Sequence, residues 1–305
     1  MTAQEVRAIG QISAAIRGSE AQLRERPLTA IDVAMISPLR CAAEQCQCLL
    51  ECARRGLPIE VLTAPAMGLT APITLAGSAA LAIAEAVAAL CLVYLVEPGL
   101  GIINTTRVQP VNMRTAAVNY GAPELGMASV LVAACCARYH LPCNLYGFGS
   151  TAGMPGIQAT MERTLSGLLM ALGHAHMITG SGLLHNGLVT SPEQLVIDDE
   201  VIRFLKRIQR PIPIAEESLG IGALLEGMAG SGTMVAEEHT LRHLRAGEIH
   251  QAGLGQWTLG AQGDALDLFD LAHTRVEEIL ASHTVAPFDA RTEARIQGIM
   301  ERWAG

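Results

Sequence analysis

The sequence predicts an α/β protein with a parallel sheet and helices outside it. Five apolar segments with strand character alternate with helical segments, at a spacing of roughly 30 to 40 residues. Because parallel neighbours need a crossover connection, this alternation is typical of βαβ units. Each strand segment also ends in a loop rich in Gly, Ser, Thr and Pro and poor in charge. If the sheet closes into a barrel, these loops line one face, where barrel active sites lie. An open doubly wound sheet would place the site at a switch point instead.

The composition narrows the class of protein. The chain has 305 residues, of which 50% are apolar, and a formal charge of −8. No basic stripe is present to neutralise phosphates, which argues against a nucleic-acid partner. The first residues are polar and amphipathic, unlike a secretory signal, and the eight cysteines lie mostly in apolar runs. We therefore expect reduced, buried thiols in a cytoplasmic protein.

The elements follow in order from a leading helix over residues 1–26, whose apolar residues recur at helical spacing. The strand segments are 28–39, 57–68, 100–106, 141–153 and 175–182. The helical segments between and after them are 40–56, 74–96, 122–140, 157–173 and 191–209. The rest of the chain is helical with glycine breaks and ends its pattern in an amphipathic helix over 264–283. We expect a single domain over 1–305, made of the leading helix over 1–26, the β/α units over 27–210 and a helical part over 211–305.

The apolar run over 66–96 raises the question of a membrane span, because it contains one charge, Glu85. Pro72 and Gly77 lie in its first third, so the continuous helix is expected to begin near Thr74. No Lys or Arg flanks the run closely, so a cationic anchor is missing. These features favour a helix of a soluble protein, buried in the core or at a subunit interface.

Two patterns could indicate a metal. His239 and His243 are four residues apart, a spacing that can bind zinc, but no third ligand is evident. A polar helix face or a partner-docking surface is the favoured interpretation. Four cysteines lie in one helical segment, at positions Cys41, Cys46, Cys48 and Cys52. Because the surroundings are apolar, we interpret them as small hydrophobic residues and predict no metal site. No P-loop is present, and "GFGSTAG" lacks the spacing of a dinucleotide-binding loop.

Several stretches carry a family resemblance when they are taken together and in order. They are "ISPLR", "PAMGLTAPITLAG", "NMRT…GAPE", "GIQATMER", "GSGLL…G…SPEQLVIDDE", "EEHTLRHLR" and "DALDLFDLAHTRVEEILASH". The sequence thus resembles the trimethylamine methyltransferase family of corrinoid-dependent methyltransferases. The resemblance implies a (β/α)8 TIM-barrel-like fold and transfer of a methyl group from a methylated amine to the cobalt of a separate corrinoid protein. It implies no tightly bound cofactor. Members without pyrrolysine, which is not encoded here, are associated with quaternary amines such as betaines.

The chain departs from the family in two ways. It begins where family members are already part-way round the barrel, so we expect a short member whose barrel is incomplete on its N-terminal side. Open sheet edges would favour a homo-oligomer. In the loop "GSTAGMPGIQATMER", the charged residues usual in the family are replaced by Ala152, Gly153 and Gly156. Two alternatives follow: an altered or inactive relative that binds a small ligand or partner, and one half of a split enzyme.

The reaction that the resemblance implies depends more on how the methyl group is positioned than on acid or base groups. Co(I) attacks a methyl carbon in line, and a quaternary donor leaves as a neutral amine. The protein must then hold a cation in a dry pocket, by aromatic faces or carboxylates.

Tyr146 and Phe148 are two positions apart at a strand end, so their side chains should point to the same face, and we predict that both face the barrel interior. The alternative is that they are plain core residues. Other substrate-binding candidates are Glu124, His185, Glu217, Arg40 and Gln158. Glu124 could instead complement a helix dipole, and Glu217 could belong to a solvated pair with Glu216. The corrinoid is expected to approach near Gly68, Thr70, Gly180 and Gly182.

Overall fold

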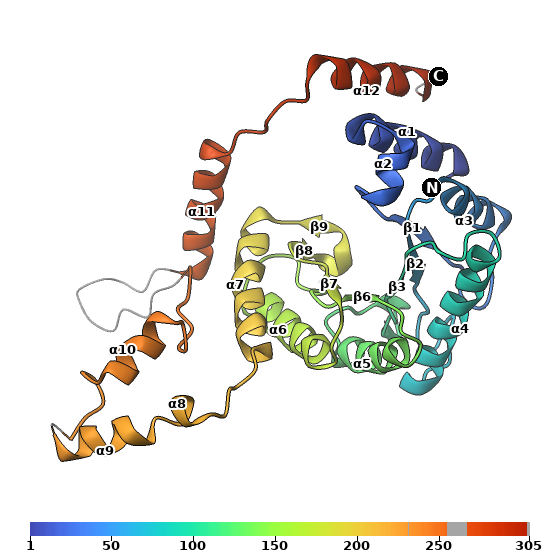
Figure 1. The fold of residues 1–305 in the computed structure, drawn as a ribbon. Helices are drawn as coiled ribbons and strands as arrows, with labels where there is room; N and C mark the ends of the chain where they lie inside the picture. Colours follow the sequence, from blue (N-terminus) through green and yellow to red (C-terminus); the bar gives the residue numbers. More distant parts are fainter. Residues whose placement is uncertain (231, 255–266, 304–305) are drawn as a thin grey trace.

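A computed structural model describes residues 1–230, 232–254 and 267–303, and its centre is a parallel sheet (Figure 1). The sheet has the order β1-β2-β3-β6-β7, and every pairing in it is parallel. Its strands are β1 (Ile31–Ala34), β2 (Ile59–Thr63), β3 (Ile102–Thr106), β6 (Cys143–Tyr146) and β7 (Met177–Thr179). Each strand lies beside the next one along the chain, without the reversal of a doubly wound sheet. The parallel α/β fold is therefore confirmed, and the closed (β/α)8 barrel remains a prediction.

Helices cover the convex side of this curved sheet (Figure 1). They are α3 (Ala43–Arg55), α4 (Leu75–Tyr94), α5 (Pro123–Arg138), α6 (Ile157–Leu172) and α7 (Pro192–Gln209). Alternate strand residues such as Ile59, Val61 and Leu145 are buried beneath these helices. The intervening residues, among them Asp32 and Glu60, therefore point to the concave side.

The segment over 1–26 contains two helices where a single one was predicted. They are α1 (Ala3–Arg17) and α2 (Glu20–Glu25). Gly18 interrupts them with a φ of 103°, a conformation that costs glycine little, and Ser19 caps the second helix by accepting a hydrogen bond from the Gln22 amide. The sequence pattern missed this break because the apolar spacing continues across it.

The helix α4 packs against β2, α3 and α5. In the part of the chain that the structure describes, it is the one helix long and apolar enough to cross a membrane. Its outer side is exposed at Ala80 and Ala84, whereas Glu85 is only 1% exposed. Burial of α4 against the sheet agrees with the prediction, and its single charge lies inside the protein.

Short hairpins and a helical C-terminal part complete the described chain. The hairpins pair β4 (Val111–Asn112) with β5 (Ala117–Val118), and β8 (Leu183–Leu184) with β9 (Val189–Thr190) around the 3-10 turn η1 (His185–Gly187). The later helices are α8 (Glu216–Leu219), α9 (Ile221–Ala229), α10 (Glu238–Arg245), α11 (Leu268–Ser282) and α12 (Ala290–Trp303). Figure 1 shows α11 beside α7 and α12 near α1, whereas α8 to α10 lie away from the sheet. The described residues of 211–305 form helices, turns and loops, and residues 264–266 of the predicted last amphipathic helix lie outside them.

Candidate functional site

The concave side of the sheet carries a polar network at its centre. Glu60 on β2 accepts hydrogen bonds through Oε2 from Thr105 Oγ1 on β3 and from Asn144 Nδ2 on β6, each at 3.0 Å. These three strands therefore share one carboxylate. A buried polar network of this kind fixes side-chain positions on a face that would otherwise be apolar.

Asp32 on β1 is a second carboxylate, close enough to Glu60 and Arg107 for their charges to affect it. Although Asp32 is solvent-exposed on this open face, desolvation by the surrounding protein raises its pKa. The guanidinium of Arg107 opposes this rise in the pKa, and the carboxylate of Glu60 adds to it. Asp32, Glu60 and Arg107 thus combine two acidic groups with one basic group on the concave side.

An aromatic pair lies at the carboxyl end of the strands. The rings of Tyr120 and Tyr146 are 4.8 Å apart between centroids, and Gln109 Nε2 donates to the Tyr120 hydroxyl at 2.7 Å. The guanidinium carbon of Arg107 lies 5.0 Å from the Tyr146 centroid, a cation–π contact. Arg107 follows β3 directly, and its amide donates to the Thr63 carbonyl at 2.9 Å.

Two polar atoms of this cluster are left without partners. Across residues 1–230, 232–254 and 267–303, neither Tyr146 OH nor Arg107 Nε makes a hydrogen bond, although both atoms are buried. Burial raises the pKa of the Tyr146 hydroxyl, and Arg107 opposes the rise. The hydroxyl is therefore a donor at neutral pH. Unpaired donors at a strand end are suited to contact a small polar ligand.

The prediction that Phe148 faces the interior with Tyr146 is wrong. Phe148 is 1% exposed and packs on the helix side with Ala171 of α6 and Leu205 of α7. The amides of Gly147 and Phe148 both donate to the Thr179 carbonyl, so the strand alternation ends at Tyr146. The alternative of plain core packing holds for Phe148.

The glycine loop after β6 is organised by Glu162 of α6. Its carboxylate accepts hydrogen bonds from Ser150 Oγ at 2.6 Å, Thr151 N at 2.9 Å and Gln158 Nε2 at 2.8 Å. Burial opposes ionisation of Glu162, but these hydrogen bonds outweigh it and hold its pKa below the usual value. The predicted substrate residue Gln158 is exposed, and its side chain is held by the hydrogen bond to Glu162.

The three small residues of that loop differ in their surroundings. Ala152 is 8% exposed, and its amide donates to Ser150 Oγ. A Cβ built on Gly153 or Gly156 meets no atom within 4 Å. This end of the loop is therefore open, with room for a side chain at Gly153, whereas the φ of 157° at Gly156 disfavours any residue other than glycine.

The loop after β7 is held by a buried ion pair. Arg163 NH1 lies 2.8 Å from Asp198 Oδ2, and both side chains are 0% exposed. The same carboxylate oxygen accepts the Gly182 amide at 2.7 Å. Gly180, at φ 105°, contacts the Tyr146 ring, because a Cβ there would lie 2.6 Å from Tyr146 Cε2. Gly180 and Gly182 therefore position the loop beside the tyrosine.

Gly68 and Thr70 form a tight turn after β2. Thr70 Oγ1 accepts the Ala66 amide at 2.9 Å, and Gly68 has φ 80°. A Cβ on Gly68 would lie 2.8 Å from Met113 Sδ. The turn thus lies next to the β4–β5 hairpin at the strand-end face.

Of the remaining predicted substrate residues, three follow strands of the sheet and one, Glu217, does not. Arg40 and His185 are exposed in the loops after β1 and β8, and Glu124 lies in the first turn of α5. Glu217 is wrongly placed by the prediction: it lies on α8, away from the sheet (Figure 1). There its Oε1 is 2.8 Å from Arg242 NH2 and 3.0 Å from His243 Nε2. The polar pair of His239 and His243 thus serves contacts between α8 and α10.

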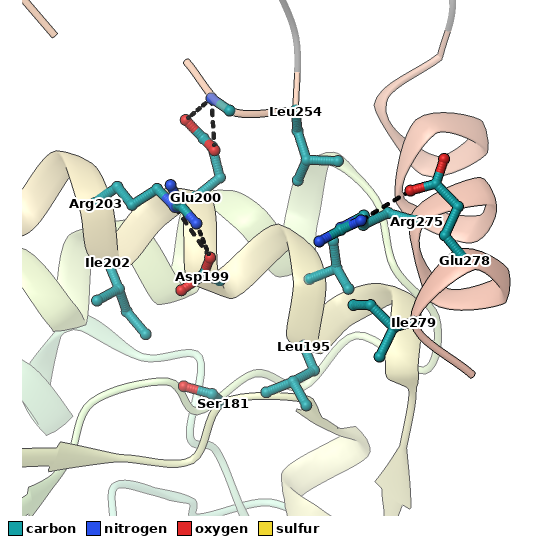
Figure 2. Close-up of a pocket in the computed structure, with 12 residues that line it drawn as sticks. Ser181, Leu195, Asp199, Glu200, Ile202, Arg203, Leu254, Arg275, Glu278 and Ile279 are labelled. Atoms are coloured by element: carbon teal, nitrogen blue, oxygen red, sulfur yellow. Dashed lines mark hydrogen bonds and ion pairs between the residues drawn. The ribbon is translucent and has the colours of Figure 1, made fainter. Parts of the chain in front are cut away.

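A cavity of about 690 Å³ lies elsewhere, between α7 and α11 (Figure 2). Its charged residues are paired with one another, Asp199 with Arg203 and Arg275 with Glu278. Glu200 accepts the Gly253 amide. With its carboxylates already compensated, this cavity is less suited to a cation than the concave face.

Sequence reasoning missed Arg107, Tyr120, Asp32 and Glu60. The signal for the two carboxylates was available, because each stands between apolar residues in a strand, in "IDVA" and "IEVLT". A charge inside such an alternation points to the face opposite the helices.

Comparison with known proteins assigns the family. The sequence model described as trimethylamine methyltransferase (MTTB) matches residues 1–304. The chain is 30% identical to the trimethylamine methyltransferase MttB of Methanosarcina barkeri over 93% of its length, and it spans 58% of that relative. It is 29% identical to the MttB of Desulfitobacterium hafniense, over 95% of the chain and 59% of the relative. A proline betaine:corrinoid methyltransferase of Eubacterium limosum is 29% identical over 63% of the chain and 40% of the relative. The chain belongs to the trimethylamine methyltransferase family.

Proposed function

We propose that the chain forms the donor site of a methyltransferase that moves a methyl group from a quaternary methylated amine to the cobalt of a separate corrinoid protein. The observation that carries this proposal is the cluster of Tyr146, Tyr120 and Arg107 above Asp32 and Glu60. Family membership supports the class of reaction. The chain spans about 58% of the relatives it matches, so the reaction of the whole family is a proposal here.

The reaction needs few titratable groups. A Co(I) corrinoid, bound as the second substrate, donates an electron pair to the methyl carbon while the C–N bond breaks. The bonding pair remains on nitrogen, which leaves as a neutral amine, so no proton is required. The residues of this chain would orient the methyl group along the line of attack and exclude water.

The distribution of charge favours a donor that carries both signs. Arg107 already lies against the Tyr146 ring, so a bare cation on that same side would meet a like charge. A betaine has an ammonium and a carboxylate. Its carboxylate would accept a hydrogen bond from the unpaired Arg107 Nε, and its ammonium would lie toward Asp32 and Glu60. We therefore propose a betaine-like donor.

The loops around this site carry exposed apolar side chains that support docking of a protein partner. One large apolar residue or more follows each strand of the sheet, with exposed fractions between 53% and 90%: Leu39, Leu69, Ile73, Met113, Met154, Ile157 and Leu188. Exposed apolar residues that gather on one face of a protein mark interaction sites. We propose that the corrinoid protein docks on this rim, with Gly68, Thr70, Gly180 and Gly182 beneath it. The same proposal includes a single-domain, cytoplasmic enzyme that forms a homo-oligomer.

The test is a methyl-transfer assay with the purified 305-residue chain. A Co(I) corrinoid protein is offered glycine betaine, proline betaine, choline and trimethylamine, and methyl–Co(III) formation is followed by absorbance. We expect transfer from a betaine and little from trimethylamine. Failure with every donor, although the donors bind, would leave the second candidate function.

That second candidate is a ligand-binding relative without methyl transfer. The open surroundings of Gly153 and Gly156 favour it, because the family usually has charged residues in this loop. It predicts betaine binding by calorimetry together with an unchanged corrinoid spectrum.

A further inference from the structure

A pair of thiols that the proposed reaction does not use lies between the end of β1 and the first turns of α3. Cys41 directly follows Arg40 in the loop after β1, and Cys46 lies in the first turns of α3. Their sulfur atoms are 3.2 Å apart, and both side chains are partly exposed. Cys46 Sγ also lies 4.0 Å from the Cys41 carbonyl oxygen.

This arrangement differs from that of the other cysteines on the same helix. Cys48 and Cys52 are buried, at 1% and 0% exposure. The thiol of Cys48 donates to the Met1 carbonyl at 3.4 Å. Only Cys41 and Cys46, among these four cysteines, combine contact between sulfurs with partial access to solvent.

We propose that Cys41 and Cys46 are a redox-active dithiol that small-molecule disulfides oxidise to an intrachain disulfide, with Cys46 as the attacking thiolate and Cys41 as the resolving thiol. A disulfide requires a sulfur–sulfur distance near 2.0 Å, so the sulfurs must approach by only about 1 Å. Rotation of two side chains near the start of α3 supplies a movement of this size.

The assignment of roles follows from Cys41. Burial and the hydrogen bond to Cys46 raise the pKa of the Cys41 thiol to about 12. Cys41 is therefore protonated at neutral pH and a poor first nucleophile, which leaves the first attack to Cys46.

The chemistry balances without a further reactant. The Cys46 thiolate attacks one sulfur of a disulfide RSSR, forms a mixed disulfide and releases RS⁻. Cys41 then loses its proton and attacks Cys46 Sγ, which forms the Cys41–Cys46 bond and releases a second RS⁻. Two electrons pass from the dithiol to RSSR, and the two thiol protons end on two molecules of RSH.

The oxidised form would fix the loop after β1 at a second point. Ser37 and Leu39 of this loop are already bound by Glu85 of α4, and the disulfide would add a covalent bond to α3. The rim residue Leu39 is two positions from Cys41, so the oxidation state would reach the proposed docking surface. The disulfide itself does not depend on the proposed methyl transfer.

The experiment treats the reduced, folded chain with excess oxidised glutathione and measures the intact mass. We expect loss of about 2 Da for the two thiol hydrogens, alongside the mass of any glutathionyl group on exposed Cys91. After denaturation and alkylation of free thiols, cleavage at Glu44 separates Cys41 from Cys46. A link between the peptide 26–44 and the peptide 45–51 is expected in the wild type and in C48S, and no link in C46S.

The single variants test the roles. C41S should retain one glutathionyl group on Cys46, formed at least about tenfold faster than any on Cys41 in C46S, because the higher pKa of Cys41 leaves less thiolate. Exposed Cys91 reports that the reagent reaches the folded protein. The proposal is overturned if Cys91 is modified while Cys41 and Cys46 remain free thiols, if the link survives in C46S, or if C46S reacts faster than C41S.

Discussion

Glu85, in the middle of α4, accepts a hydrogen bond from the Ser37 hydroxyl at 2.8 Å, across 48 positions of the chain. Its other carboxylate oxygen accepts the Leu39 amide at 2.9 Å. The charge that stands alone in the apolar run over 66–96 thus holds the loop after β1 at the edge of the candidate site. A carboxylate at the centre of a helix that faces lipid costs free energy, whereas this one makes two hydrogen bonds inside the protein.

Replacing Glu85 by Leu should destabilise the fold. The variant removes the acceptor of the hydrogen bonds from the Ser37 hydroxyl and the Leu39 amide, each of which contributes about 0.5–1.5 kcal/mol. A84L, one position along the same helix at an exposed residue, should change the free energy of unfolding by less than about 0.5 kcal/mol. Urea denaturation measures both. Equal effects of the two substitutions would contradict a role for the Glu85 contacts.

The pair of Arg163 and Asp198 should show strong coupling. R163M leaves the Asp198 carboxylate buried without its ion partner, which costs about 3–5 kcal/mol. In the double variant R163M/D198N the uncompensated charge is gone, so its loss of stability should be smaller than the sum of the losses in R163M and D198N by more than about 1 kcal/mol. Additive losses in urea denaturation would show that the pair does not act as a unit.

The stability that the Glu162 hydrogen bonds contribute should depend on pH. Because the pKa of Glu162 is lowered in the folded protein, its ionised form contributes stability above the unfolded value of 4.5. That contribution is lost as the pH falls through the folded pKa. The stability difference between wild type and E162Q should therefore be larger at pH 7 than in strong acid. A difference that is the same at both pH values, measured by thermal unfolding, would refute this.

Two glycines of the strand-end loops should respond differently to alanine. G180A places a methyl group against the Tyr146 ring at a positive φ, so it should lower the melting temperature and displace the ring. G153A adds a methyl group in open space and should leave the melting temperature nearly unchanged. Similar melting temperatures for both variants would mean that Gly180 does not position Tyr146.

The parallel sheet with helices outside it and the burial of α4 could be predicted because they follow from alternation and composition along the chain. The break at Gly18 and the end of the strand alternation at Tyr146 could not, because each depends on a local backbone change that leaves the apolar pattern intact. The second change places Phe148 on the helix side instead of the predicted concave side.

The site was only partly predictable for a related reason. Tyr146 was found because it ends a strand, whereas Arg107 contacts it from a neighbouring strand end. Contacts of this kind depend on strand order and register, which bring residues distant in sequence together. Glu217 was misplaced because it follows the apolar stretch "RPIPIA", whose alternation is typical of a strand but which leads into α8, away from the sheet.

Calorimetric titration of the wild type and R107M with glycine betaine and choline tests the central claim, that the concave strand-end cluster holds a zwitterionic methyl donor. Choline presents the same trimethylammonium group without a carboxylate. The wild type should bind betaine at least about tenfold more tightly than choline, since a charge-assisted hydrogen bond contributes about 1.5–3 kcal/mol. R107M should lose this preference and F148L, a change on the helix side, should keep it. A preference for betaine that survives in R107M would contradict the account.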